Sequence, residues 1–459
     1  MSKFDGVMHR VPINENNPSI ICNDSLCKKC QLCKKACSGV AGVLGTYNLE
    51  ENGDNAVCIN CGACITACPF NALSEVYNIA GVLQAIHDDS KKVIFLTAPA
   101  VRVSLGDAFG MESGTNVQGK MVTALRMLGA DVVLDVTFGA DLTIMEEASE
   151  LVYRIQNNGV LPMFTSCCPG WVKYCEIYFP ELIPNLSSCK SPIAMQATMV
   201  KTYYAKKMGL DPKDLVVVSV APCTAKKAEC KRPELSAGMK SLGLEGQDCD
   251  MSITTRELSV MIKEAGIDFA NLKDSPYDPF MGTGTGSGMI FGNTGGVMEA
   301  ALRTAFFLIE GRNMNDDELP KFEAVRGFDH VKEAEVTLGG KTIRVAVMHQ
   351  MSEAAKGIKE LMAGDKHYDF VEIMACKGGC AGGGGQIKII KKPLQEAARV
   401  NRNTTIYDMD KKANIRFCHD NPEIKTIYKD FLEAPLSHVS HELLHTTFED
   451  KSWELTGKK

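Results

Sequence analysis

The sequence lacks long hydrophobic runs and lacks an excess of positive charge. No window of the 459 residues approaches the ~18 consecutive apolar residues of a membrane span, so no membrane partner is expected. The first residues, MSKFDGVMHRVPINENN, contain no apolar core of a secretory signal, which favours a cytoplasmic protein. The 50 basic and 56 acidic side chains give a net charge of −6, so charge gives no reason to expect nucleic acid.

Cysteine, in contrast, is abundant, with 19 residues. An exported protein could pair them as disulfides, whereas a protein in a reducing compartment uses thiols for metal binding or catalysis. At about 150 residues per domain, the length predicts two or three domains. Chains of this size bury enough apolar surface to fold without covalent crosslinks. The cysteines therefore indicate metal or redox chemistry.

Two runs of four cysteines, at residues 27–37 and 58–68, share the spacing C-x2-C-x2-C-x3-C. This spacing is that of bacterial two-cluster ferredoxins, in which the fourth cysteine of each run serves the other cluster. A zinc site, usually built from two separated pairs, does not explain two equal runs. Ser38, where proline is usual, is a small departure. The predicted ligands of the two [4Fe-4S] clusters are Cys27, Cys30, Cys33 and Cys68 for one, and Cys58, Cys61, Cys64 and Cys37 for the other.

Beyond residue 80 the composition changes to apolar β-rich runs that alternate with helical stretches, which predicts an α/β domain with a largely parallel sheet. The expected strands are 91–101, 131–138, 160–166, 214–222, 343–349 and 369–375, and two of the expected helices are 140–158 and 195–209.

Three of these strands end in cysteine, in TSCCPGW (165–171), APCTAKKAEC (221–230) and MACKGGCAGGGGQ (374–386). Ligands bind beyond the carboxyl ends of strands in open α/β sheets. The residues alone therefore favour a four-thiolate site of Cys168, Cys223, Cys376 and Cys380. Buried cysteine is also often a small apolar residue without a ligand, and this alternative stays open at this point.

The three segments resemble the signature segments of [FeFe]-hydrogenases, whose patterns are TSCCPxW, PCxxKxxE and ExMxCxxGCxxGGGQ. The resemblance implies an enzyme that reversibly reduces protons to H2, with electrons relayed from ferredoxin through two [4Fe-4S] clusters to an H-cluster. It implies a catalytic domain with largely parallel sheets in two lobes, beside a small α+β ferredoxin-like domain. The expected boundaries are 1–78 for the ferredoxin-like domain, 79–395 for the catalytic domain and 396–459 for a helical C-terminal segment that wraps it.

The resemblance also assigns roles. Cys168, Cys223, Cys376 and Cys380 would hold the [4Fe-4S] part of the H-cluster, and Cys380 would bridge to a diiron subcluster with CO, CN and azadithiolate ligands. Hydrogenase maturation proteins are implied as partners. Lys226 would donate a hydrogen bond to a cyanide, while Pro99 and Met374 would line the diiron pocket.

A proton route is implied from the Cys167 thiol through Glu147, Ser187, Glu150 and Arg154. Glu147 and Glu150 are i,i+3 and Glu150 and Arg154 are i,i+4, so the three share a helix face. By itself, EEASELVYR favours a solvated amphipathic face. The resemblance reverses that interpretation.

The chain departs from better-studied members at Ala100, Ile193 and Ala221, where a hydroxyl residue, an amide and methionine are usual. These changes leave the predicted ligands intact and suggest another branch, group B. The alternatives are a hydrogen sensor and a non-catalytic, hydrogenase-like iron–sulfur protein. Retention of Cys167, Lys226 and Met374 argues against the second.

Other motifs are weaker. HELLH (441–445) matches the zincin pattern, but too little chain follows for a third ligand. The glycine-rich segment 281–300 fits no nucleotide motif and predicts a close-approach loop beside the H-cluster. The lysines at 28, 29, 34 and 35 would offset cluster charge or steer an acidic ferredoxin. The remaining cysteines are expected to be structural or free thiols: Cys22, Cys175, Cys189, Cys230, Cys249 and Cys418.

Overall fold

The structure, a computed structural model, describes residues 9–315, 318 and 324–458. In this part of the chain the strands form one two-stranded and two four-stranded sheets. The strands are β1 (Ile20–Cys22), β2 (Leu73–Glu75), β3 (Lys92–Thr97), β4 (Val132–Asp135), β5 (Met163–Phe164), β6 (Leu215–Ala221), β7 (Met251–Thr254), β8 (Val331–Leu338), β9 (Lys341–His349) and β10 (Phe370–Met374).

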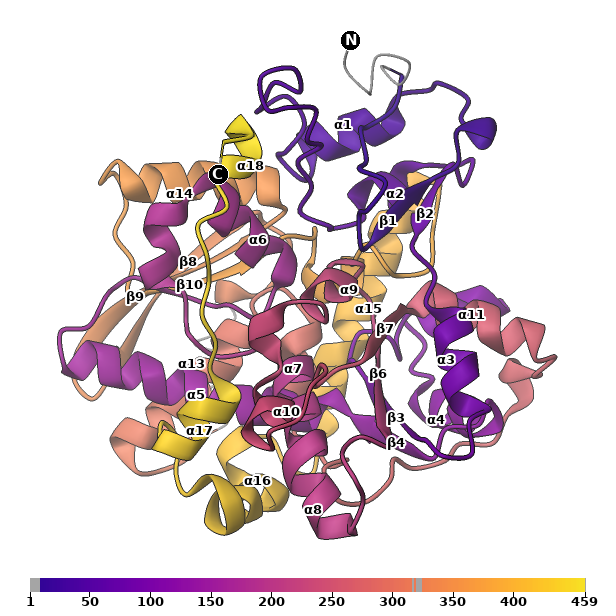
Figure 1. Cartoon of the computed structure of the whole chain (residues 1–459). Coiled ribbons are helices and arrows are strands. Elements are labelled where there is room, and N and C mark those ends of the chain that lie inside the picture. The colour runs from indigo at the N-terminus through magenta and orange to yellow at the C-terminus, as the bar shows by residue number, and fades with distance from the viewer. Residues whose placement is uncertain (1–8, 316–317, 319–323, 459) are drawn as a thin grey trace.

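The α-helices are distributed along the whole chain (Figure 1). Their bounds are α1 (Leu32–Gly39), α2 (Ala63–Ala67), α3 (Ile79–Ile86), α4 (Gln118–Met127), α5 (Val136–Gln156), α6 (Pro169–Tyr178), α7 (Pro192–Met199), α8 (Ala205–Met208), α9 (Ala225–Glu229), α10 (Ala237–Ser241), α11 (Thr255–Glu264), α12 (Gly286–Met289), α13 (Gly296–Glu310), α14 (Met351–Met362), α15 (Lys392–Lys412), α16 (Pro422–Ile427), α17 (His438–Leu444) and α18 (Trp453–Thr456).

The first four-stranded sheet has the order β4-β3-β6-β7, and all its strand pairs are parallel. Successive side chains of a strand point to opposite faces. In β3, Val93 and Phe95 pack toward α3, α4 and α11, whereas Ile94 and Leu96 pack toward α5 and α7. Both faces are covered, which explains why these strands are continuous apolar runs.

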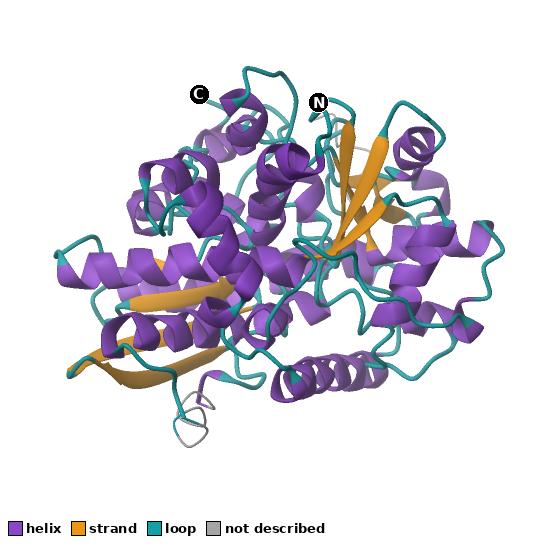
Figure 2. Ribbon diagram, turned by 90° about the horizontal axis from the view of Figure 1, so that it is seen from below, coloured by secondary structure: helices purple, strands orange, loops and turns teal. Residues whose placement is uncertain are grey.

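The second four-stranded sheet has the order β5-β10-β9-β8. β5, β10 and β9 are parallel, and β8 forms an antiparallel hairpin with β9 at the edge. Helices α5 and α13 pack on one face, and α6 and α14 pack on the other. The two sheets lie on opposite sides of the molecule, with helices between and around them (Figure 2).

Helix α5 contributes to the cores of both lobes. Ile144, Ala148 and Leu151 pack with the second sheet, while Phe138 and Leu142 pack with the first. The helix starts directly after β4, because the Asp135 side chain accepts a hydrogen bond from the backbone N–H of Thr137 and caps it. The strand expected over 131–138 therefore ends at Asp135.

The N-terminal segment forms a small α+β unit that lies on top of the rest of the chain in Figure 1. Its β1 and β2 pair antiparallel. Glu75 at the end of β2 forms an ion pair of 2.9 Å with Arg256 of α11 and accepts a hydrogen bond from Thr254. These contacts attach the unit to the first lobe.

The C-terminal segment runs across both lobes and returns to the N-terminal unit (Figure 1). Arg303 of α13 pairs with Asp410 of α15 at 2.8 Å inside the protein. Further along, Glu176 of α6 accepts hydrogen bonds from Lys451 and from the backbone N–H of Glu449. The amide of Asn52 reaches the carbonyl of Glu454.

The predicted fold class is confirmed, because the structure has parallel α/β sheets in two lobes and a small α+β unit. The expected helix over 195–209 is α7 followed by a π-helical turn at Val200–Tyr204 and then α8. Strands β7 and β8 were not predicted from the sequence. None of the helices in the described residues has the length and apolarity to cross a membrane.

Candidate active site and metal centres

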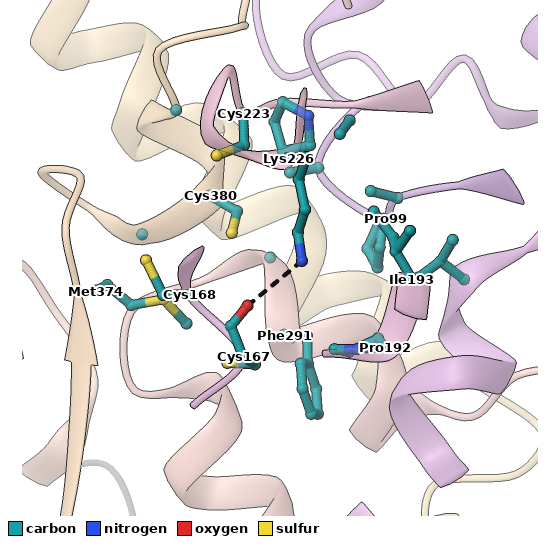
Figure 3. Close-up of a pocket in the computed structure, with 18 of the residues that line it drawn as sticks. Pro99, Cys167, Cys168, Pro192, Ile193, Cys223, Lys226, Phe291, Met374 and Cys380 are labelled. Atoms are coloured by element: carbon teal, nitrogen blue, oxygen red, sulfur yellow. Dashed lines mark hydrogen bonds between the residues drawn. The ribbon is translucent and has the colours of Figure 1, made fainter. Parts of the chain in front are cut away.

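Three strand-end loops converge on one cavity of about 80 Å³. Cys168 follows β5 and precedes Pro169 at the start of α6, Cys223 follows β6, and Cys376 and Cys380 follow β10. All four cysteines line the cavity, and Figure 3 shows three of them, Cys168, Cys223 and Cys380. β5 and β10 belong to one sheet and β6 to the other, so the cavity lies between the carboxyl ends of two sheets rather than beside one.

The rest of the cavity wall is largely apolar. It includes Pro99, Ile193, Phe291 and Met374 (Figure 3). Phe291 comes from the glycine-rich segment 281–300, which was expected to approach the site closely. The departures Ala100 and Ala221 also line or flank this space. Apolar walls exclude water and strengthen the electrostatic interactions inside.

The glycines of the 374–386 loop are required by its packing. Gly379 has φ +77°, a left-handed conformation, and a Cβ there would lie 2.5 Å from the backbone nitrogen of Thr294. A Cβ on Gly383 would collide with the carbonyl of Pro222. The loop therefore wraps the cavity with bare backbone, as expected where protein approaches a bulky group.

Lys226 extends into the cavity from α9, three residues after Cys223. Its ammonium pairs with Glu229 at 2.7 Å and lies 3.5 Å from the carbonyl of Cys167 (Figure 3). Burial acts to lower the pKa of Lys226, but Glu229 outweighs it, so the pKa is raised. Lys226 is a permanent cation in this pocket, ready to donate to an anionic group.

Cys167 is buried at the floor of the cavity, next to Cys168. Burial raises the pKa of its thiol well above the usual value, and the neighbouring Glu147 and Cys168 raise it further. The thiol therefore keeps its proton at neutral pH. A protonated thiol beside a carboxyl group can donate a proton into the cavity and be reprotonated from behind.

The four remaining proton-route residues lie together on and beside α5. Arg154 donates to Glu150 at 2.6 Å, and Ser187 donates to the other oxygen of Glu150 at 2.8 Å. Glu147 is fully buried, and neither of its oxygens has a well-formed hydrogen bond among the described residues. Burial first, and Glu150 second, raise the pKa of Glu147 to about 8. The face of this helix is therefore buried, not solvated as the pattern alone favoured.

The N-terminal cysteines surround two small cavities. One is lined by Cys27, Cys30, Cys33 and Cys68. The other is lined by Cys37, Cys58, Cys61 and Cys64. The structure thus brings the fourth cysteine of each run to the other group, as the spacing predicted. Cys30 is exposed, which puts the first group nearer the surface.

The second N-terminal group lies against the catalytic cavity. Cys61 lies close enough to Cys376 to contribute to the raised pKa of the Cys376 thiol. Cys223 in turn contributes to the raised pKa of Cys61. Thr224, next to Cys223, donates a hydrogen bond of 2.6 Å to the carbonyl of Asn60. A Cβ on Gly62 would lie 2.6 Å from the Thr224 hydroxyl and 3.1 Å from the carbonyl oxygen of Gly384, so this backbone packs closely against the cavity loops.

Two residues of this region belong to the quoted motifs, but no role was assigned to them from the sequence. Glu229 fixes the Lys226 ammonium, and the Lys226–Glu229 spacing of one helical turn could have indicated it. Glu372 of β10 is fully buried and accepts hydrogen bonds from the backbone of Gly295 and Met298. It ties β10 to the start of α13, and its interior position only emerges from the fold.

Family models match most of the chain. The iron only hydrogenase large subunit, C-terminal domain, matches residues 91–384, and the iron hydrogenase small subunit matches 396–451. A 4Fe-4S binding domain matches 53–74.

Individual relatives agree with these family models. Iron hydrogenase 1 of Clostridium pasteurianum is 44% identical over 446 residues, which cover 94% of this chain and 76% of that protein. The periplasmic [Fe] hydrogenase large subunit of Nitratidesulfovibrio vulgaris is 46% identical over 368 residues, 72% of this chain and 85% of that protein. A solved structure of the [FeFe]-hydrogenase HydA1 from Chlamydomonas reinhardtii aligns with TM-score 0.71 and 38% identity, covering 84% of this chain and 100% of that one.

A further relative, protein NAR1 of Arabidopsis thaliana, is more distant, at 29% identity over 408 residues, 85% of this chain and 84% of that protein. The fold and the thiol-lined cavity define an iron–sulfur oxidoreductase. The chain belongs to the [FeFe]-hydrogenase family, and it is an iron hydrogenase that carries [4Fe-4S] clusters and the H-cluster. The donor set fits these groups, because soft thiolates are the ligands that iron–sulfur clusters take.

Proposed function

We propose that this hydrogenase works in the cytoplasm, exchanges electrons with a ferredoxin and binds its clusters through the cysteines described above. The observation that carries the proposal is the cavity itself, where four cysteines from three strand-end loops meet Lys226 and Cys167. The ligands would be Cys168, Cys223, Cys376 and Cys380 for the H-cluster, and the two N-terminal groups for the [4Fe-4S] clusters. The proposed domains are 1–78, 79–395 and 396–459.

When bound, the H-cluster supplies the redox-active iron at which two protons and two electrons combine to H2. Lys226, held by Glu229, orients and offsets the negative charge of the cofactor. Pro99 and Met374 line the apolar wall and would contact the diiron part. Hydrogenase maturation proteins would insert the cofactor into this cavity.

The protein supplies the protons through its own side chains. Arg154 and Ser187 hold the carboxylate of Glu150 from two sides. Ser187 also lies beside Glu147, whose raised pKa keeps it protonated near neutral pH. Glu147 in turn neighbours the Cys167 thiol. We propose that protons enter at the half-buried end beside Arg154, which positions Glu150, and pass to Cys167 at the cavity by this series of short transfers.

Electrons would enter at the exposed end of the N-terminal unit. Cys30 is exposed, and Lys28, Lys29 and Lys35 around it are exposed too. A local basic patch attracts an acidic carrier even though the whole chain is negative. The second cysteine group then lies between this entry point and the catalytic cavity.

The test is infrared spectroscopy and hydrogen evolution on protein matured anaerobically with the hydrogenase assembly machinery. We expect bands from iron-bound CO and CN, and H2 evolution from reduced viologen. Cys167→Ser should keep the bands and lose turnover by about 10²–10⁴-fold, the usual size of a lost acid–base catalyst. Cys175→Ser, which changes another buried cysteine, should keep both. Matured protein without the bands and without H2 evolution would refute the proposal.

A further inference from the structure

A second cluster of metal-ligating side chains lies outside the catalytic cavity. Glu150 of α5, Cys189 and His445 each offer one donor atom, and these atoms lie within 4.8 Å of one another. All three residues are buried. The geometry points to a binding site for a zinc-type divalent transition metal, with Cys189, His445 and Glu150 as its protein ligands.

The backbone holds Cys189 and His445 opposite each other. They form an isolated antiparallel β-bridge, which is closed by hydrogen bonds from Lys190 N to the Leu444 carbonyl at 2.9 Å and from Thr446 N to the Ser188 carbonyl at 2.8 Å. Residues directly opposite in such a pair have Cβ atoms about 4.5–5.5 Å apart. Two of the three ligands are therefore positioned by main chain rather than by mobile side chains.

The imidazole of His445 is already oriented for a metal. Its Nε2 lies 3.1 Å from Glu146, which is fully buried. Its Nδ1 faces the Ser188 hydroxyl at 2.8 Å, on the side of Glu150. A histidine ligand usually donates its second ring N–H to a carboxylate, which fixes the tautomer. Glu146 can serve that purpose, and Tyr428 donates to it at 2.6 Å.

The donor set matches zinc. Thiolate, imidazole and carboxylate are each zinc donors, and three protein ligands with a water in the fourth position is the arrangement of open zinc sites. The Cys189 sulfur lies 3.7 Å from Glu150 Oε2, close to the roughly 3.5 Å that ligands of one zinc ion adopt. The other donor atoms lie within 4.8 Å of one another, so they need to approach by no more than about 1.5 Å to share one zinc ion. On binding, the Cys189 thiol gives its proton to solvent and the metal takes its place.

This site is not the zincin pattern HELLH. Helix α17 ends at Leu444, so His445 lies outside it and has extended backbone. Glu442, the residue that would act as base, is exposed. His441 stacks face to face on His445, with ring centroids 4.5 Å apart, and lies outside the donor group.

A metal bound at this site would regulate H2 evolution. This effect rests on the proton route proposed above. Glu150 is both a ligand here and the carboxylate between Ser187 and Arg154. A divalent ion bound to it would remove a proton carrier. We therefore expect zinc to inhibit H2 evolution reversibly, without displacing iron.

The test uses chelator-washed holoenzyme and zinc sulfate under anaerobic conditions. Zinc K-edge X-ray absorption reports the zinc ligands without interference from iron, and competition with a chromophoric chelator gives the affinity. We expect one zinc per chain with one sulfur at about 2.3 Å and nitrogen or oxygen at about 2.0–2.1 Å. Glu146→Gln should weaken binding about 10–100-fold, and Cys189→Ser and His445→Gln should weaken it by at least that factor. The controls Cys175→Ser and His441→Gln should bind like wild type.

Zinc in a four-sulfur shell, or affinity unchanged in both Cys189→Ser and His445→Gln, would overturn the site. If His441→Gln abolished binding, the ligand set would be wrong. Zinc bound with the expected shell but without inhibition would leave the site standing and would contradict the proton route through Glu150.

Discussion

The N-terminal unit and the catalytic cavity both gather cysteines, but they do so in different ways. The eight N-terminal cysteines lie within residues 27–68 and are carried by short helices and loops. The four cavity cysteines are spread over residues 168–380 and come together only because two sheets meet. A local thiol cage can stay near the surface, where electrons enter. A cage built from distant loops lies in the interior, where water is excluded.

The difference also concerns charge. The exposed end of the N-terminal unit carries exposed basic residues such as Lys28 and Lys29, which act at long range and are screened by salt. The catalytic cavity holds a buried Lys226–Glu229 pair. Electrostatic interactions in the cavity are less screened, so the position of each charged side chain has a larger effect on its interactions.

The largest expected effect is a difference between the N-terminal cysteines and the four cavity cysteines in how their loss affects hydrogen evolution. Cys376→Ser removes a thiol of the buried cavity, so hydrogen evolution should fall below detection and the infrared bands should be lost. Cys30→Ser removes an exposed thiol at the entry end. We expect it to keep the bands and to slow viologen-driven turnover only severalfold, because a small donor can reach the inner cluster.

Measuring the iron content and infrared spectra of the two serine variants tests this prediction. If Cys30→Ser lost the CO and CN bands, the two cages would depend on each other for stability, and the distinction drawn above would fail.

The next effect tests the proton side of the cavity. Glu147→Gln keeps the shape of the side chain and removes its proton exchange, so H2 evolution should drop by about 10²–10⁴-fold with the infrared bands intact. In wild type, turnover should fall as the pH rises through about 8, because the pKa of Glu147 is raised to about 8 and the group loses its proton above that value.

The matched control is Glu335→Gln, which changes an exposed carboxylate of the β8–β9 hairpin and should leave the pH profile of the wild type unchanged. Glu147→Gln protein with normal turnover would exclude Glu147 from the route.

The smallest effects concern stability. Arg102 is buried and pairs with Asp135 at 2.6 Å beneath the cavity loops. Arg102→Met leaves Asp135 buried without its partner, so we expect a loss of about 3–5 kcal/mol in unfolding free energy. The exposed pair Arg344–Glu335 should lose no more than about 1 kcal/mol in Arg344→Met. Denaturant unfolding of the apoprotein measures both losses of unfolding free energy. Equal losses in the two variants would contradict the expectation that the buried ion pair stabilises the fold more than the exposed one.

Much of the fold was predictable from local patterns. The runs at 214–222 and 369–375 became β6 and β10, because strands covered on both faces are continuously apolar. β8 was missed, since its alternation of exposed and buried residues at a sheet edge gives a weaker signal. The end of β4 was missed because Asp135 caps α5 through a side-chain contact.

Part of the site was predictable from the sequence as well, and part was not. The spacing of the N-terminal runs predicted which cysteines share a cavity, since a few residues of chain constrain them strongly. The burial of Glu147 and Glu150 was not predictable from EEASELVYR, because an amphipathic pattern does not show what covers its polar face. Here Ser187 and the C-terminal segment around His445 cover it.

The sequence by itself determined the continuous apolar strands, the chemistry of the thiols and the loops that carry them, because these depend on residues close together in the chain. Only the tertiary structure decided that Cys168, Cys223, Cys376 and Cys380 surround one space, and that Cys189 and His445 lie opposite each other. Such contacts depend on how two sheets and a C-terminal segment pack, and that packing is set by the summed burial of many side chains rather than by any local pattern.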